Sequence, residues 1–405
     1  MSLAAPPPEG HRRRGSSVGN IDLGDNTSPS LTTMYRSPSS RKRSDARIAQ
    51  LSSTPESDLA VAGKIWVAFR ELAYRHTWIG PGLVMVSLLA TFFLSPAGSA
   101  VHETLARGIL LSYHIPGTDQ YGKGVNDFYF VFFYSLVFTF LREFIMTCIL
   151  KPLASACGVR REAKQKRFME QTYATLYTGC SGPFGLWIMS KLPLWYFETT
   201  PFYTNYPHKT NDFYFKLYYL GQAAYWVQQT VVLSLQLEKP RKDFKELVLH
   251  HIITIALIWC SYRFHFTWMG LAVYITMDVS DFFLSVSKTL NYVNSRLTTP
   301  FFLVFVASWI YLRHYLNLKI LWSVLTEFRT VGEWELNWDT QQYKCWISQP
   351  IVFFLIGALQ LVNGYWLFLI LRILARYLKG DNPSDERSDD EEEEEEEQVE
   401  EKKNQ

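Results

Sequence analysis

The stretches 247–260, LVLHHIITIALIWC, and 268–293, WMGLAVYITMDVSDFFLSVSKTLNYV, decide the fold. Both lie in apolar runs suited to crossing about 30 Å of hydrocarbon as helices that rise 1.5 Å per residue. The first carries the adjacent histidines His250 and His251, and the second carries Asp278 and Asp281. Because ionisable residues at membrane depth are costly, these four indicate a functional site.

Similar apolar runs recur along the chain between two polar tails. They predict an all-α polytopic membrane protein with about eight transmembrane helices. The expected spans are 79–95, 127–150, 168–191, 212–236, 247–264, 268–293, 301–325 and 350–374. None has the short apolar core and cleavage site of a signal peptide.

The segments outside the spans differ in composition. Residues 1–58 predict a disordered basic tail, and residues 380–405 predict a disordered acidic tail. Residues 59–76 have the spacing of an amphipathic helix on the membrane surface, or form a plain leader into the first span. The region 77–162 would hold the first two spans and their linking loops. Nucleic-acid binding is disfavoured, because the basic clusters lie at span ends or in the tail.

The charges of the short loops predict the orientation. Lysines and arginines gather after the second, fourth, sixth and eighth spans, so both termini are expected in the cytosol. Lys402 and Lys403 then resemble a dilysine signal for retrieval to the endoplasmic reticulum, which works on a cytosolic C-terminus. The alternative is two lysines that simply end a charged tail.

The polar residues of the fifth and sixth spans are expected to meet. A short turn joins these spans into an antiparallel hairpin, and Asp278 and Asp281 are three residues apart on one helix. We expect both aspartates and one histidine to form a buried cluster that opens to the cytosol. An imidazole beside a carboxylate is a better base or nucleophile, and two carboxylates can hold an ammonium. This set suits acyl transfer onto an amine, and the alternative is a structural clamp between helices.

Other polar residues in the spans are Arg142, Glu143, Arg313 and His314. A metal site is not expected: adjacent helical histidines point about 100° apart, and the chain has only nine histidines. The five cysteines show no paired spacing, so no disulfide framework or zinc site is predicted.

The block 242–292 resembles the signature of the ceramide synthases. In it His250 and His251 are followed by Asp278 and Asp281, and then by Lys288, Asn291 and Tyr292. The resemblance extends over a TLC domain at about 163–379, and the tails resemble those of the fungal branch.

The resemblance implies an enzyme of the endoplasmic reticulum membrane that transfers a long or very long fatty acyl group from acyl-CoA to sphinganine or phytosphingosine. Six spans would form a barrel-like bundle, with two more beside it. His250 would be the nucleophile or general base, Asp278 and Asp281 would orient it and hold the ammonium, and His251 would support it. Acyl-CoA would be a co-substrate, with no cofactor.

Further implications concern binding and regulation. Lys288, Asn291 and Tyr292 are candidates for substrate binding. Arg160, Arg161, Lys239 and Arg241 would meet the phosphates of CoA, or would serve only as charged anchors at the span ends. The family also implies a homodimer or a heterodimer with a paralogue, a small single-span accessory subunit, and phosphorylation at Ser384 and Ser388.

Two other classes stay open at this stage. One is a TLC-domain protein that senses or organises lipid without catalysis, and the other is a proton-coupled transporter, although the chain shows no internal repeat. The sequence does not reveal the preferred acyl-chain length or sphingoid base.

Overall fold

The computed structural model describes residue 72 and residues 76–235 and 243–379. Several predictions therefore concern residues outside these ranges: the two tails, most of the segment 59–76, Lys239, Arg241, Ser384, Ser388, Lys402 and Lys403.

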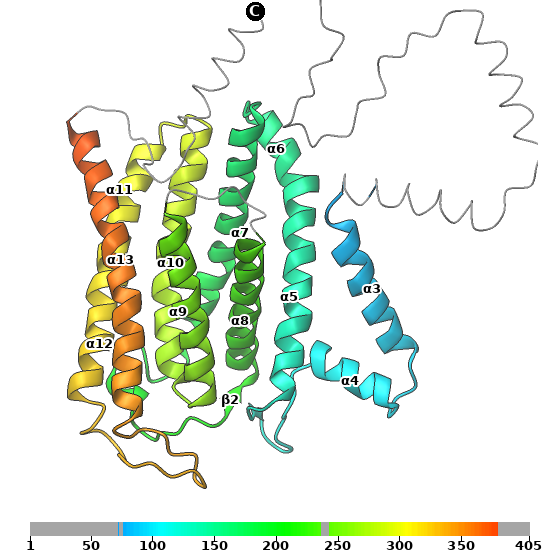
Figure 1. Cartoon of the computed structure of the whole chain (residues 1–405), viewed down its shortest axis with the longest axis vertical. Helices are drawn as coiled ribbons and strands as arrows, with labels where there is room; N and C mark the ends of the chain where they lie inside the picture. The colour runs from blue at the N-terminus through cyan, green and yellow to red at the C-terminus, as the bar shows by residue number, and fades with distance from the viewer. Residues whose placement is uncertain (1–71, 73–75, 236–242, 380–405) are drawn as a thin grey trace, which may run out of the picture. The chain divides into compact units, whose positions relative to one another are not determined.

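Helices occupy all eight predicted runs, which confirms an all-α polytopic membrane protein (Figure 1). By length and apolar composition, five helical stretches in the described chain can cross a membrane: 126–156, 244–263, 267–292, 298–326 and 348–378. The helices are α3 (Ile79–Leu94), α5 (Asn126–Phe144), α7 (Glu162–Ser190), α8 (Phe213–Ser234), α9 (Phe244–Arg263), α10 (Thr267–Tyr292), α11 (Thr298–Ser308), α12 (Asn317–Thr326) and α13 (Ser348–Leu378).

Two spans contain a π-helical segment. The second span continues from α5 through η1 (Ile145–Leu150) into α6 (Lys151–Ala156). The seventh span passes from α11 through η3 (Trp309–Leu316) into α12. A π-helical turn shifts the register of the side chains that follow it, and such turns are frequent at functional sites.

The connections between spans contain short elements that the sequence pattern did not predict. Helix α4 (Ala100–Ile109) follows α3, and the Ser99 side chain caps it by accepting a hydrogen bond from the His102 backbone at 3.2 Å. Strand β1 (Gln120–Tyr121) pairs antiparallel with β2 (Asn211–Asp212), so the segment before α5 is tied to the start of α8. A short 3₁₀ helix, η2 (Thr200–Phe202), precedes β2.

Small residues allow α7 and α10 to pack closely. Gly182 and Gly185 lie on the face of α7 that meets α10. A Cβ atom would lie 3.3 Å from Val279 Cγ2 at Gly182, and 2.9 Å from Ile275 Cγ1 at Gly185. In lipid the hydrophobic effect does not drive helices together, because the lipid tails are themselves apolar. Helix association there depends on close packing, which these small residues allow.

The helices that follow α6 pack in a ring. Helix α7 contacts α8, α8 contacts α9, α9 contacts α13, α13 contacts α12, and α11 and α7 both pack against α10. One end of this bundle carries the α9–α10 turn and the loop 327–347, and we call it the loop end (lower in Figure 1). The other end carries the start of α9 and the end of α13, and we call it the tail end.

Candidate active site

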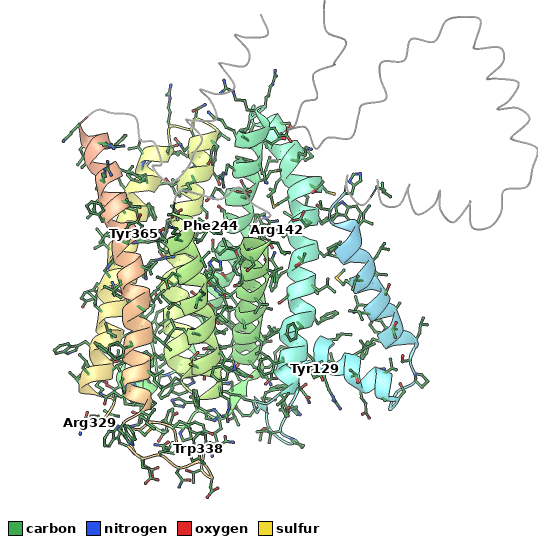
Figure 2. The ribbon with its side chains drawn as sticks, viewed as in Figure 1. Tyr129, Arg142, Phe244, Arg329, Trp338 and Tyr365 are labelled. Atoms are coloured by element: carbon green, nitrogen blue, oxygen red, sulfur yellow. The ribbon has the colours of Figure 1, made fainter. Side chains whose placement is uncertain are left out.

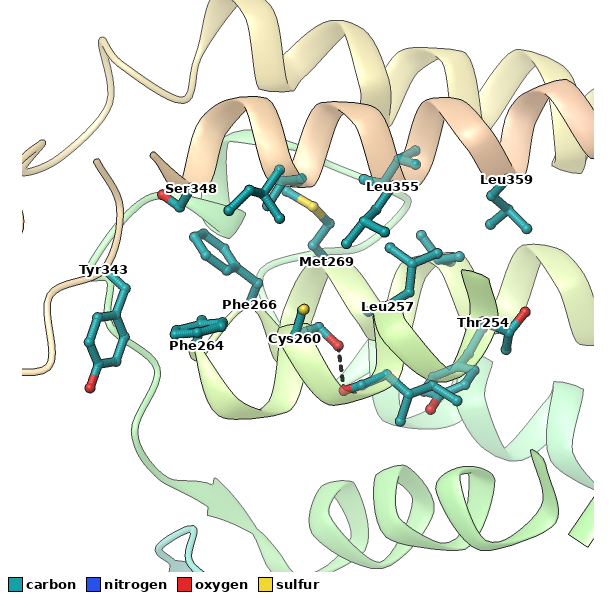
Figure 3. Close-up of a pocket in the computed structure, with 18 of the residues that line it drawn as sticks. Thr254, Leu257, Cys260, Phe264, Phe266, Met269, Tyr343, Ser348, Leu355 and Leu359 are labelled. Carbon is teal, nitrogen blue, oxygen red and sulfur yellow. Dashed lines mark hydrogen bonds between the residues drawn. The ribbon is translucent and has the colours of Figure 1, made fainter. Parts of the chain in front are cut away.

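A cavity of about 220 Å³ lies among α8, α9, α10 and α13 (Figure 3). It extends from His250 and Trp226 to Phe264, Phe266 and Tyr343 at the loop end. Along α9, the 14 residues from His250 to Phe264 rise about 21 Å. The walls between are mostly apolar and include Leu257, Met269, Val273, Met277, Val352, Leu355 and Leu359. The shape suits an elongated apolar chain.

His250 is the histidine that lines this cavity. Its side chain is buried, with 6% of the residue exposed, and its ring lies edge-on to Trp226 at 5.6 Å and to Trp366 at 5.2 Å between centroids. The Trp366 indole N–H donates to Asp243 Oδ2 at 3.1 Å, which fixes that ring at the start of α9. The buried Nδ1 atom of His250 has no hydrogen-bond partner in the structure. The imidazole is therefore held by packing, and its Nδ1 atom is available to react with a substrate.

His251 has a different environment. Its Nδ1 lies 2.9 Å from the carbonyl oxygen of Leu247, so this nitrogen carries a proton and donates it to the helix backbone. Its ring also packs against Trp226, at 5.6 Å. His251 therefore bonds to its own helix, whereas His250 faces the cavity.

Asp278 is buried between α10 and α8, with 3% of the residue exposed. It accepts a hydrogen bond from the Gln222 amide and another from the Tyr218 hydroxyl at 3.5 Å. The Gln222 carbonyl oxygen in turn accepts from the Tyr177 hydroxyl at 2.9 Å. The two donors to the carboxylate, Gln222 and Tyr218, are uncharged, so neither of these hydrogen bonds places a cation beside Asp278.

Asp281 instead forms an ion pair with Arg313 of η3, at 2.5 Å. The Asp281 side chain is 33% exposed, whereas Arg313 is 2% exposed. Arg313 also donates to Ser280 Oγ at 2.6 Å and to Asn363 Oδ1 at 3.2 Å, and its guanidinium lies 3.9 Å from the centre of the Trp309 ring. This network joins α10, η3 and α13.

The predicted single cluster is thus distributed over three environments. His250 packs against tryptophans, Asp278 bonds to α8, and Asp281 pairs with η3. Positions three apart on a helix differ by about 60° in direction, so the two aspartates meet different neighbours. Gln222, Asn363 and the flanking tryptophans are not among the residues predicted from the sequence. The amides could have been found as polar side chains within apolar spans.

The residues predicted to bind substrate lie toward the tail end. Asn291 is exposed near the end of α10, and Tyr292 packs against the small core of Ala154, Val159 and Phe168. Lys288 is half-buried one turn earlier. Arg160 and Arg161 are exposed just before α7. Within the described ranges, no three His, Cys, Asp or Glu side chains are placed to hold a metal ion.

Comparisons with known proteins identify the family. The model of the TLC domain family matches residues 167–372. A ceramide synthase of Saccharomyces cerevisiae is 56% identical over 93% of this chain and 92% of its own length. A sphingosine N-acyltransferase of Schizosaccharomyces pombe is 52% identical, covering 78% of this chain and 81% of its own. A sphingosine N-acyltransferase-like protein of Gibberella moniliformis is 49% identical, covering 80% and 85%. This chain therefore belongs to the TLC-domain family, as an acyltransferase of the fungal ceramide synthase type.

Proposed function

We propose that this enzyme transfers a long or very long fatty acyl group from acyl-CoA to the amine of sphinganine or phytosphingosine, forming a ceramide. The names of its relatives support the substrate class. The observation that carries the proposal is that His250, with an unpartnered Nδ1, borders an elongated apolar cavity. An acyl chain inside the cavity would bring its thioester to the imidazole.

We propose a reaction in two steps. An unprotonated nitrogen of His250 attacks the thioester carbonyl carbon, the C–S bond breaks, and CoA leaves as a thiolate. The sphingoid amine then attacks the acyl-imidazole, the C–N bond to the ring breaks, and the proton lost by the amine is taken up by the CoA thiolate, which leaves as the thiol. His250 as a general base, taking that proton while the amine attacks the thioester directly, is the alternative route.

The carboxylates would hold the amine in its ammonium form before it loses a proton. Asp278 suits this role because the donors it bonds are uncharged. Asp281 already faces the cation of Arg313, so we propose that it acts mainly by fixing Arg313 and the adjacent turn of α10. His251 supports His250: its hydrogen bond to the Leu247 carbonyl oxygen fixes the start of α9, where both histidines lie.

The location, orientation and regulation of the enzyme are proposed from its family. We propose that the enzyme is in the endoplasmic reticulum membrane with both termini cytosolic, so that the tail end and the CoA group face the cytosol. There Arg160, Arg161, Lys239 and Arg241 could meet the CoA phosphates. Neither a metal nor a cofactor is needed. A dimer, a single-span accessory subunit, retrieval through Lys402 and Lys403, and phosphorylation at Ser384 and Ser388 are parts of the same proposal.

The test is ceramide formation by the purified full chain. Acyl-CoA of graded length would be supplied with sphinganine or phytosphingosine, and the accessory subunit would be co-expressed. We expect wild type to form ceramide and folded His250→Ala to form none. Folded wild-type protein that forms no ceramide at any length would overturn the proposal and favour a lipid-sensing role.

A further inference from the structure

A second polar cluster lies at the loop end, where the segment before α5 meets the α9–α10 turn. Lys123 Nζ donates to the carbonyl oxygen of His208 at 2.8 Å and to Thr267 Oγ1 at 3.3 Å, and lies 3.4 Å from His265 Nδ1. An ammonium has three N–H groups, and these three acceptors can use all of them. Lys123 itself lies outside the TLC domain match.

His265 connects this lysine to the end of the cavity. Because its Nδ1 faces the ammonium as an acceptor, Nε2 carries the proton and donates to Gln341 Oε1 at 3.1 Å. The ring also stacks on Tyr343, with centroids 5.9 Å apart and an interplanar angle of 14°. Phe264 and Phe266, on either side of His265 in the chain, line the cavity together with Tyr343.

The backbone at both ends of this hydrogen bond adopts a costly conformation. His265 has φ of 62° and Gln341 has φ of 56°. Residues other than glycine rarely occupy this left-handed region, and they stay there when their surroundings fix them. Lys123 and the His265–Gln341 hydrogen bond supply such fixing contacts.

We propose that Lys123 is a positioning residue that fixes the floor of the cavity and thereby limits the length of the acyl chain. We define the floor as Phe264, Phe266, Leu336, Trp338 and Tyr343, all of which line the cavity; Trp338 is labelled at the loop end in Figure 2. A chain longer than the cavity must displace the floor, and the lysine opposes this by holding the turn through His265. This proposal rests on the proposed acyl transfer. It gives the segment before α5, which contains Lys123, a role in selecting the acyl-chain length.

The test compares Lys123→Met with wild type, with Lys319→Met as control. Like Lys123, Lys319 donates to a backbone carbonyl in a loop, that of Phe197 at 3.0 Å. Neither Lys319 nor Phe197 lines the cavity. The readout is the ratio of kcat/KM for an acyl-CoA two carbons beyond the preferred length to that for the preferred one. We expect Lys123→Met to raise this ratio about tenfold. Lys319→Met should leave this ratio unchanged. Lys123→Arg keeps the positive charge, so its ratio should stay close to that of wild type.

A merely structural role for Lys123 would lower kcat/KM for all lengths by one factor. A constant ratio in folded Lys123→Met would therefore overturn the proposal. If that variant does not fold, His265→Asn replaces it, since asparagine tolerates positive φ but is too short to join both partners.

Hydrogen exchange separates this proposal from the proposed function. We expect faster exchange at residues 263–267 and 336–343 in Lys123→Met, but not in Lys319→Met. Unchanged exchange there would overturn the positioning role. If wild type formed no ceramide, the proposed function would fail, and exchange alone would decide whether Lys123 holds the floor.

Discussion

Trp226 and Trp366 position the His250 ring without occupying its Nδ1 atom. A hydrogen bond at that nitrogen would fix the tautomer but would also reduce its reactivity. Edge-on aromatic packing restrains the ring while leaving the nitrogen unpaired. The two tryptophans therefore take a direct part in the site, because they set the orientation of the imidazole.

Replacing Trp366 with phenylalanine should affect both stability and rate. The change removes the N–H donor to buried Asp243, at an expected cost of about 1–3 kcal/mol in the free energy of unfolding. It also loosens the imidazole, and we expect kcat to fall about 10- to 100-fold. Trp322→Phe is the matched control because Trp322 is 65% exposed. Unchanged kcat in Trp366→Phe would mean that the ring does not need this contact.

Gly270 is a second residue with a specific steric demand. A Cβ there would lie 2.1 Å from the Tyr219 hydroxyl, which is hydrogen-bonded to Ser261 at 2.5 Å. Gly270→Ala should therefore displace Tyr219, narrow the cavity and cost about 1–3 kcal/mol of stability. At Gly221 a Cβ would meet nothing within 4 Å, so Gly221→Ala should be neutral or slightly stabilising. Thermal unfolding in detergent checks both, and equal Tm values for the two variants would contradict the geometry.

At the scale of the element, α10 presents its two aspartates to different neighbours. Asp278 faces α8, whereas Asp281 faces the π-helical segment η3 through Arg313. Loss of activity on replacing Asp281 therefore does not by itself show a catalytic role. Removing one partner of this pair leaves a charge unpaired next to the helix core.

A double-mutant cycle separates these roles. Asp281→Asn alone should destabilise by up to about 3 kcal/mol, at the low end of the range for buried pairs because Asp281 is partly exposed. The double variant Asp281→Asn/Arg313→Met should lose less than the sum of the single losses, with a coupling of about 1–3 kcal/mol. Unfolding measurements that add without coupling would show that the ion pair does not stabilise α10 against η3.

The segment before α5 should confer a pH dependence on stability. Burial, together with the charge of Lys216, lowers the pKa of Lys123 from 10.5 to about 7, although Asp127 opposes this shift. Between these values the unfolded chain binds more protons than the folded one, so stability should rise with pH from about 7 toward 10.5. Burial also lowers the pKa of His265 to about 3 and of His208 to about 4, and these groups change stability only in acid.

The measurement is Tm at a series of pH values between 7 and 9. Wild type should gain stability across this range, and Lys123→Met should show a flatter profile. Lys123→Met also removes hydrogen bonds, which lowers Tm at every pH. The two proteins are therefore compared by the change of Tm per pH unit and not by Tm itself. Parallel profiles for the two proteins would contradict the assignment to Lys123.

In the whole molecule, each of the eight apolar runs of the sequence proved to be helical in the described residues, with α11 and α12 sharing one run. Helix α4 was not predicted because AVHETLARGI is short and mixes polar with apolar residues. The partners of Asp278 and Asp281 could not be predicted, since they depend on how α10 is rotated against α8 and η3. The floor of the cavity could not be predicted either. The position of the loop 327–347 depends on contacts between residues far apart in the sequence, such as that of His265 with Gln341.

In the proposed reaction, His250 receives the acyl group at the end of this cavity. The most direct measurement is the intact mass of the full chain after incubation with acyl-CoA in the absence of a sphingoid base. We expect the mass to increase by one acyl group located on His250. This adduct should be absent in His250→Ala and should be converted to ceramide when sphinganine is added. Ceramide formation at the wild-type rate with no such adduct, or with an adduct on another residue, would contradict it.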